Sequence, residues 1–193
     1  MTMPLSRYLS GDFVTPAMTF AWERGIAYSL FGPGGRRDLP KDTPFGGADA
    51  PEKRAQFIPM IVDDLKKLPG AVGASAWDEA SVAAPTFHRV DPSSYERLLE
   101  VAKTRVTRPS FLSFLKRKTA GPAHVTASVF LPVSFDVPFD MPVVFERVAG
   151  SAPGALRELE AAGWPDATSS ARETLLEALR DAVRLQLPMI VDT

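Results

Sequence analysis

The chain has no cysteine among its 193 residues. Without thiols it forms no disulfide, holds no metal through thiolate and has no cysteine nucleophile. It has only two histidines, His88 and His124, so a metal site would depend on carboxylates and would suit Mg²⁺ or Ca²⁺. Acidic pairs such as Asp63–Asp64 lack the spacing of an EF-hand loop. We therefore expect no metal and no cofactor.

Long apolar runs are also missing. No segment is long enough to cross a bilayer, and residues 1–13 lack the charged-then-apolar pattern of a signal peptide. The net charge of −1 gives no general attraction to nucleic acid or to an anionic membrane. A hydrophobic content of 45% is that of an ordinary globular protein. We expect one cytoplasmic globular domain over residues 1–193, and its composition does not indicate an oligomeric state.

Alternation of apolar residues is most regular between residues 123 and 148. Every odd-numbered position from 125 to 139 is apolar, whereas the positions between are mostly polar or proline. A period of two predicts a strand with one face on the core and the other in solvent, and His124 falls on the solvent face. We expect the other elements to pack against this segment.

The prolines of this segment share the parity of its polar face. Pro132, Pro138 and Pro142 all stand at even positions. Residues of equal parity point their backbone N–H groups toward the same edge of a strand, and proline has no N–H to donate. The pattern predicts an edge strand around Pro132, with an open side that a partner can cover.

Other strands and several helices are predicted around this segment. Alternation on both sides of Gly25 predicts a hairpin, with a helix over residues 17–24 as the alternative, and a loop follows as far as Gly47. Residues suited to N-caps precede three amphipathic segments, at Asp49, Asp91 and Ser170. The expected helices cover residues 49–68, 91–106, 109–118, 153–162 and 170–184, and residues 189–191 suggest a last short strand. The predicted fold class is α+β, a mainly antiparallel sheet (strands near 17–31 and 124–148) covered chiefly on one face by four or five helices.

Catalytic motifs are incomplete in this sequence. In the glycine-rich segment 32–35, Pro33 removes one of the amides that a phosphate loop needs. Around Ser75 the chain has the first half of a nucleophile elbow, but Trp77 replaces the last glycine. We therefore name no catalytic residue. The alternative is a small-molecule hydrolase or other enzyme whose site is assembled from loops, with these candidate residues: His88, Asp91, Asp136 and Asp140.

One charge feature is uneven. Between Val101 and Lys118 the chain carries six basic residues and no acidic one: Lys103, Arg105, Arg108, Lys116, Arg117 and Lys118. Such a cluster suits an acidic protein partner, and with Phe111 and Phe114 among the cations it would also suit nucleic acid. We expect a non-catalytic protein-binding protein, of the accessory, inhibitor or immunity type, that contacts its partner through this basic patch and the exposed strand edge. Nucleic-acid binding through 103–118 is the second alternative.

Overall fold

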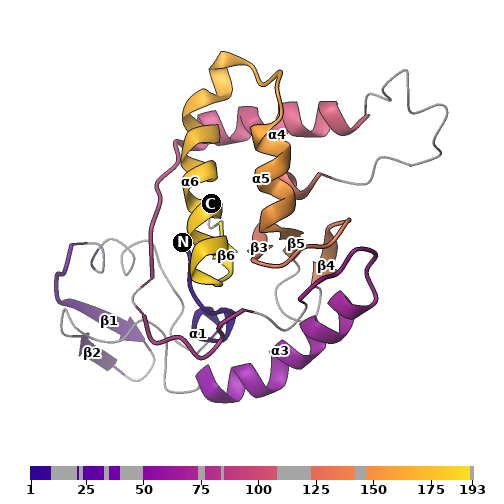
Figure 1. Cartoon of the computed structure of the whole chain (residues 1–193). Coiled ribbons are helices and arrows are strands. Elements are labelled where there is room, and N and C mark those ends of the chain that lie inside the picture. The colour runs from indigo at the N-terminus through magenta and orange to yellow at the C-terminus, as the bar shows by residue number, and fades with distance from the viewer. Residues whose placement is uncertain are drawn as a thin grey trace.

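The computed structural model describes residues 1–9, 21, 24–32, 35–39, 50–73, 77–83, 85–107, 123–141 and 147–191. In this part of the chain five α-helices surround a four-stranded sheet, which confirms the α+β class (Figure 1). The helices are α1 (Leu5–Tyr8), α3 (Ala50–Lys66), α4 (Pro92–Thr107), α5 (Ala152–Glu160) and α6 (Ser169–Leu185), and the 3-10 turns are η2 (His124–Thr126) and η3 (Asp166–Thr168). The strands are β1 (Tyr28–Gly32), β2 (Gly35–Leu39), β3 (Val129–Leu131), β4 (Phe139–Met141), β5 (Arg147–Ser151) and β6 (Met189–Ile190).

The central sheet has the strand order β4-β5-β3-β6 and is mostly antiparallel. Only β3 and β5 run parallel, and α5 and α6 follow β5 directly in the chain. The N-terminal residues continue the sheet beyond β6. The Ile190 amide donates to the Met1 carbonyl at 2.7 Å, and Thr2 forms a single antiparallel bridge with Thr86. The β6 side of the sheet is therefore covered, whereas β4 forms the other end of the strand order.

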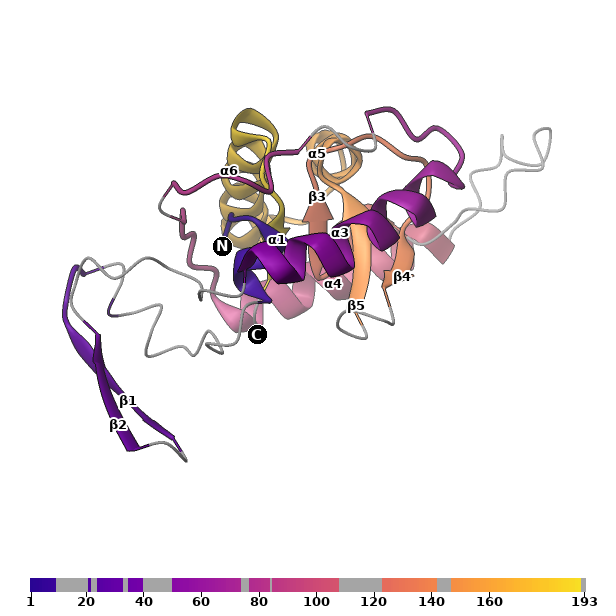
Figure 2. The ribbon, with the colours of Figure 1, turned by 90° about the horizontal axis from the view of Figure 1, so that it is seen from below.

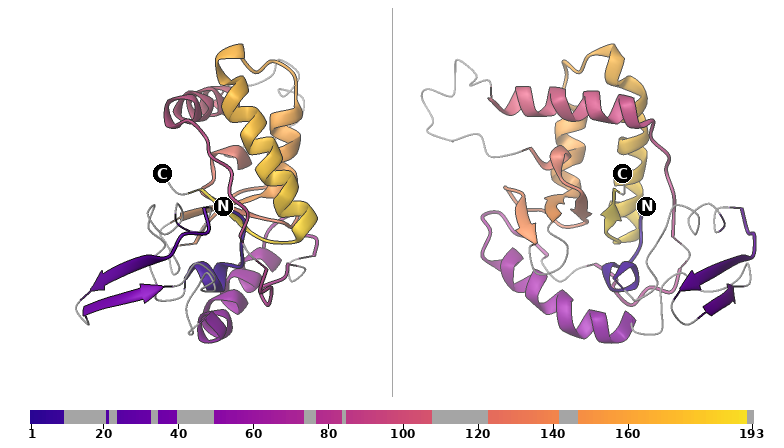
Figure 3. Two further views of the ribbon diagram at one scale, coloured as in Figure 1. Left: turned by 90° about the vertical axis from the view of Figure 1, so that its left-hand side faces the viewer. Right: turned by 180° about the vertical axis from the view of Figure 1, so that it is seen from behind.

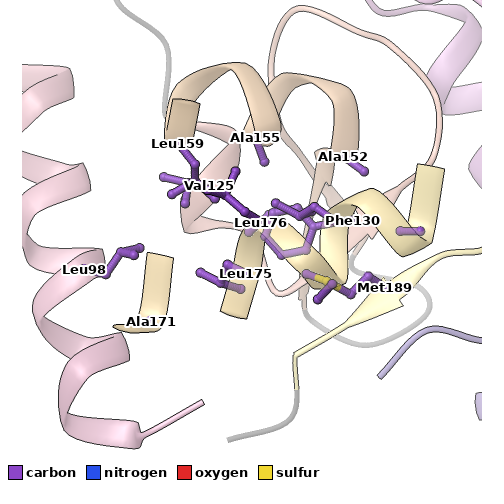
Figure 4. Close-up of a cluster of buried hydrophobic side chains, with 14 of the residues drawn as sticks. Leu98, Val125, Phe130, Ala152, Ala155, Leu159, Ala171, Leu175, Leu176 and Met189 are labelled. Atoms are coloured by element: carbon purple, nitrogen blue, oxygen red, sulfur yellow. The ribbon is translucent and has the colours of Figure 1, made fainter. Parts of the chain in front are cut away.

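Helices lie on both faces of this sheet (Figure 2). One face carries the larger core, in which Phe130 and Met189 pack against residues of α4, α5 and α6 (Figure 4). The other face carries a second core, where Val129 and Leu131 pack with residues of α1 and α3. Successive residues of a strand point to opposite faces. The apolar run Val129–Leu131 is thus divided between the two cores.

This arrangement corrects the interpretation of residues 123–148. The odd positions from 125 to 135 are buried as predicted, but Phe130 at an even position is also fully buried. The segment is not one long strand, because β3 ends at Leu131 and pairing with β5 resumes only at Phe139. Pro132, which has no N–H for the ladder, follows β3 directly.

The predicted edge strand at Pro132 is wrong. β3 pairs with β5 on one side and with β6 on the other, so it is internal to the sheet. Just before the strand, the Ser128 amide donates to the Val148 carbonyl at 3.1 Å. Pro132 and Pro138 lie in the segment between β3 and β4, and Pro142 lies outside the described residues. The strand that forms an end of the sheet is β4.

The described part of the N-terminal region contains a hairpin other than the predicted one. β1 pairs antiparallel with β2, so this hairpin reverses between Gly32 and Gly35, whereas the turn at Gly25 precedes β1. The expected loop to Gly47 therefore contains the strand β2. The alternating apolar residues that precede Gly25, at positions 18, 20 and 22, lie outside the described part. The hairpin forms its own two-stranded sheet and extends away from the body of the molecule (Figures 2 and 3).

The helix predictions have mixed outcomes. α3 forms within the range expected for the first helix and includes Pro59, and the expected cap Asp49 lies outside the described residues. The Asp91 cap of α4 is confirmed by a hydrogen bond from the Ser94 amide to Asp91 Oδ2 at 2.8 Å. The predicted Ser170 cap is wrong, because α6 begins at Ser169 and Thr168 is the N-cap residue. The short strand β6 confirms the C-terminal prediction. The helix expected over 109–118 lies outside the described residues. No helix in the described ranges is long and apolar enough to span a membrane.

Candidate binding pocket beside Arg105

Two of the six predicted binding residues lie in the described part of the chain, and both are on α4. Lys103 is exposed, and Arg105 is half-buried near the C-terminal end of the helix. Arg108, Lys116, Arg117 and Lys118 lie outside the described residues. The structure thus describes the surroundings of only part of the predicted patch. We consider Arg105 further because its contacts are the most specific.

Arg105 is held against the loop that follows α5. Its Nη2 donates to the Ala162 carbonyl at 2.5 Å, and its guanidinium carbon lies 4.4 Å from the centre of the Trp164 ring. The chain can turn between these two contacts because Gly163 has a φ of +91°, which glycine adopts without strain. The Trp164 indole N–H donates to the Glu158 carbonyl at 3.0 Å and so fixes the ring.

A pocket of about 260 Å³ opens beside this stacked pair. It lies where α4, the η2 turn and the end of α5 meet, and its lining is mainly apolar. The lining residues are Ala102, Arg105, Ala123, Val125, Glu158, Ala161 and Trp164. Three of these are alanines, and their short side chains leave the space between the helices open.

Glu158 brings a carboxylate to the pocket, but this carboxylate already has partners. Its Oε1 accepts from the His124 amide at 2.9 Å and its Oε2 accepts from the Val125 amide at 2.8 Å. These two amides begin the η2 turn, so they lack partners within it. Among the described residues no carboxylate forms an ion pair with Arg105. The Arg105 guanidinium at the rim of the pocket is therefore the charged group that remains available to a ligand.

The alternative catalytic residues do not come together in one site. His88 Nε2 lies 2.9 Å from Asp181 on α6, and Arg184 donates to the other oxygen of Asp181 at 2.6 Å. The hydrogen bond from Arg184 lowers the pKa of Asp181 below its usual value, and the bond to His88 adds to this effect. Thus the partner of His88 is a residue that the sequence analysis did not consider.

The sheet itself separates His88 from Asp140. Thr86, two residues before His88, bridges to Thr2 beyond the β6 side, whereas Asp140 lies on β4 at the other end. Five strand spacings therefore separate Asp140 from Thr86. At about 4.8 Å for each spacing, these two residues are about 24 Å apart across the sheet. Asp91 caps α4, and Asp136 faces Gly70. The loop-assembled site expected from the sequence is not formed by these four residues.

His124 is buried, which overturns its expected place on a solvent face. Its Nδ1 accepts a hydrogen bond from the Ser151 amide at 3.0 Å, and its ring makes an edge contact with Phe135 at 5.4 Å between centroids. Burial lowers the pKa of His124, although the nearby Glu158 carboxylate acts in the opposite direction. Through these contacts His124 packs the η2 turn, to which it belongs, against β5.

Arg105 is one of the candidate residues named from the sequence, whereas the residues that surround it were not predicted. Arg105 and Ala162 are far apart in the chain, and no local pattern connects α4 to the end of α5. In the described ranges no three or more histidines, aspartates or glutamates are grouped so as to hold a metal ion. No family model, curated protein or solved structure matches this chain. The pocket is therefore the feature from which a function is argued.

Proposed function

We propose that this protein is a non-catalytic protein-binding protein, and that Arg105 contacts an acidic partner. The observation that carries the proposal is the position of Arg105 at the rim of an open, mainly apolar pocket. Binding sites between proteins commonly combine a buried apolar anchor with arginine and aromatic side chains. Arg105, Trp164 and the alanines of the pocket supply these elements on one surface.

The charge distribution supports an acidic partner. The segment from Val101 to Lys118 has six cations and no acid, although the whole chain has a net charge of −1. An acidic surface would be attracted to this segment, and the attraction would weaken with ionic strength. The accessory, inhibitor or immunity-type role remains the proposed class. An enzyme or a nucleic-acid-binding protein gains no comparable observation from the described residues.

Affinity capture from the native lysate tests this proposal. The tagged protein is used at low and moderate salt, and bound proteins are quantified by mass spectrometry. We compare the wild type with Arg105→Gln and use Arg97→Gln as the control, because Arg97 is an exposed cation on the same helix and does not line the pocket. Both variants remove one charge, so a difference between them reports the site rather than net charge.

We expect one dominant, near-stoichiometric protein that is lost at least tenfold with Arg105→Gln and retained with Arg97→Gln. Equal retention in both variants would remove Arg105 from the interface. Enrichment of no protein would contradict a protein-binding role. Capture of nucleic acid, with steep loss on raising the salt concentration, would favour the nucleic-acid alternative instead.

A further inference from the structure

We infer that the pocket beside Arg105 receives one aromatic side chain of the acidic partner, next to a carboxylate that meets the Arg105 guanidinium. This inference rests on the proposed function and names the chemistry that the pocket would recognise. It depends on three properties of the described residues: the volume of the pocket, the nature of its walls and the placement of its charges.

The volume limits the occupant to about one ring. A dry apolar cavity of about 150 Å³ binds benzene, and sites for drug-sized ligands begin at roughly 300 Å³. The pocket beside Arg105 measures about 260 Å³. It therefore has room for a single aromatic ring and its linking carbon, and not for a dinucleotide or a similar cofactor.

The walls suit an apolar ring. Val125 and Ala102 are almost completely buried and form the apolar part of the lining, together with Ala161. Trp164 adds an aromatic wall, and pairs of aromatic rings are stabilised beyond their buried area. The main-chain contacts of Glu158 and Trp164 hold these walls in place before a ligand arrives.

The charges select an anion rather than a cation at the rim. A cationic ligand stacking on Trp164 would meet the Arg105 guanidinium, which already lies 4.4 Å from the ring centre. A carboxylate beside the ring would instead be attracted to the Arg105 guanidinium. Arginine offers five N–H donors, and among the described residues only one hydrogen bond from this guanidinium is made, to Ala162. The remaining donors favour a carboxylate.

The occupant is a side chain of a partner rather than a free small molecule. Sites for small molecules usually enclose most of the ligand surface. Here the rim is formed by Ala161, which is exposed, and Arg105, which is half-buried. An open pocket of this size suits a single anchor residue whose neighbours contact the surrounding surface.

Peptide titration followed by NMR tests the inference on the intact protein. The readout is the indole N–H resonance of Trp164, assigned by comparison with Trp164→Phe. The probes are the acetylated and amidated peptides EEFEE, EEAEE and QQFQQ, with phenylacetate as the free aromatic acid. We expect saturable shifts with EEFEE, binding weaker by tenfold or more with EEAEE because the ring is missing, and binding several-fold weaker with QQFQQ.

Two variants locate the binding within the pocket. Ala161→Trp fills the pocket from its exposed rim and should abolish the EEFEE shifts. Ala167→Trp adds the same side chain at an exposed position of η3 outside the lining and should leave them unchanged. Equal binding of EEFEE and EEAEE, or full binding by Ala161→Trp, would overturn the inference. Phenylacetate binding as tightly as EEFEE would also overturn it, in favour of a small-molecule site.

The same variants separate this inference from the proposed function. If the captured partner is lost with Arg105→Gln but retained in full by Ala161→Trp, the protein-binding role stands and the aromatic anchor is wrong. If EEFEE binds as expected but no protein is captured, the pocket chemistry is correct and the protein-binding role is wrong. Loss of the captured partner with Ala161→Trp and its retention with Ala167→Trp, together with tighter binding of EEFEE than of EEAEE, supports both.

Discussion

The imidazole ring of His124 lies directly against the α carbon of Gly154. A Cβ built on Gly154 would lie 2.9 Å from both Cγ and Nε2 of His124, and closer still to Cδ2. Real Cβ atoms essentially never approach heavy atoms so closely. Gly154 belongs to the first turn of α5, and the Ser151 side chain that caps this helix accepts from the Gly154 amide at 3.0 Å. The absence of a side chain at 154 therefore allows the η2 turn and α5 to pack together.

Gly154→Ala should destabilise the fold by up to about 2 kcal/mol. Alanine is intrinsically better than glycine in a helix by about 1 kcal/mol, but the methyl group would overpack the buried ring, which costs typically 1–3 kcal/mol. Urea unfolding followed by circular dichroism measures the difference. In a His124→Ala background the same substitution should be neutral or stabilising. A stabilising effect of Gly154→Ala in the wild type would show that the ring is not confined as described.

Stability should fall as the pH is lowered below about 6.5, because His124 is buried in its neutral form. Burial lowers the pKa of His124 in the folded state, and its ordinary value is 6.5. Below that pH the unfolded chain binds a proton that the folded chain resists, so the contribution of His124 to stability is complete above about 6.5 and is lost toward the folded-state pKa. Charged groups facing the ring from α5 are Glu158, which opposes the shift, and Arg157, which adds to it.

Chemical unfolding between pH 7.5 and 5 measures this dependence. We would use His88→Gln, in which His124 is the only histidine left, so that no other imidazole titrates. The slope for one proton does not exceed about 1.4 kcal/mol per pH unit. NMR titration of the His124 ring checks the direction independently. A His124 pKa above 6.5 would contradict the described burial and hydrogen bonding.

Glu79→Gln should loosen the attachment of the N-terminal helix. The buried Glu79 carboxylate accepts four hydrogen bonds: from the amides of Leu5 and Ser6 at 2.9 Å, from Ser6 Oγ at 2.7 Å and from Trp77 Nε1 at 2.8 Å. An amide would place an NH₂ group against donors, so bonds are lost while their partners stay buried. We expect a loss of about 2–4 kcal/mol in the free energy of unfolding.

Hydrogen exchange of the Leu5 and Ser6 amides reports this loss locally. The control is Glu173→Gln on the exposed side of α6, which should change stability by less than about 0.5 kcal/mol. If both variants are equally stable, the carboxylate does not anchor α1. Fast exchange confined to these two amides would show that α1 opens on its own.

Thr2→Val should be neutral or stabilising by up to about 1 kcal/mol. Thr2 is fully buried, and its hydroxyl has no hydrogen-bond partner among the described residues. Replacing an unpartnered buried hydroxyl by a methyl group removes its desolvation cost and keeps the shape. The control is Thr168→Val, because the Thr168 hydroxyl is also buried but donates to the Pro165 carbonyl at 2.7 Å. Thermal unfolding should rank Thr2→Val above Thr168→Val, and the reverse order would contradict this description.

Much of the local structure follows from the sequence. The apolar stripe of α6 and the cap at Asp91 depend on side chains within one or two turns of each other, so local spacing predicts them. The α+β class follows in the same way, from segments with periods near two and near 3.6. The exact start of α6 was missed because Ser169 continues the helix backward from the expected cap at Ser170.

The arrangement of the strands was not determined by local spacing. The alternation around Val129 shows that one face is buried, but it does not show whether the other face meets water or a second layer of helices. Here α1 and α3 cover that face, so Phe130 and Val129 are both buried in separate cores. The parity of Pro132 likewise does not show whether the strand before it lies at an edge of the sheet. Strand order depends on pairing between segments that are distant in the chain, and β3 pairs with two such segments, β5 and β6.

The sequence by itself determined the absence of thiol chemistry, the α+β class and the presence of Arg105 in a stretch rich in cations. Only the tertiary structure decided that Arg105 stacks on Trp164 beside a pocket, and that His124 is buried against Gly154. Helix caps and amphipathic faces are set by neighbours along the chain. A pocket is set by the packing of segments that are distant in the sequence, and that packing has no local signature.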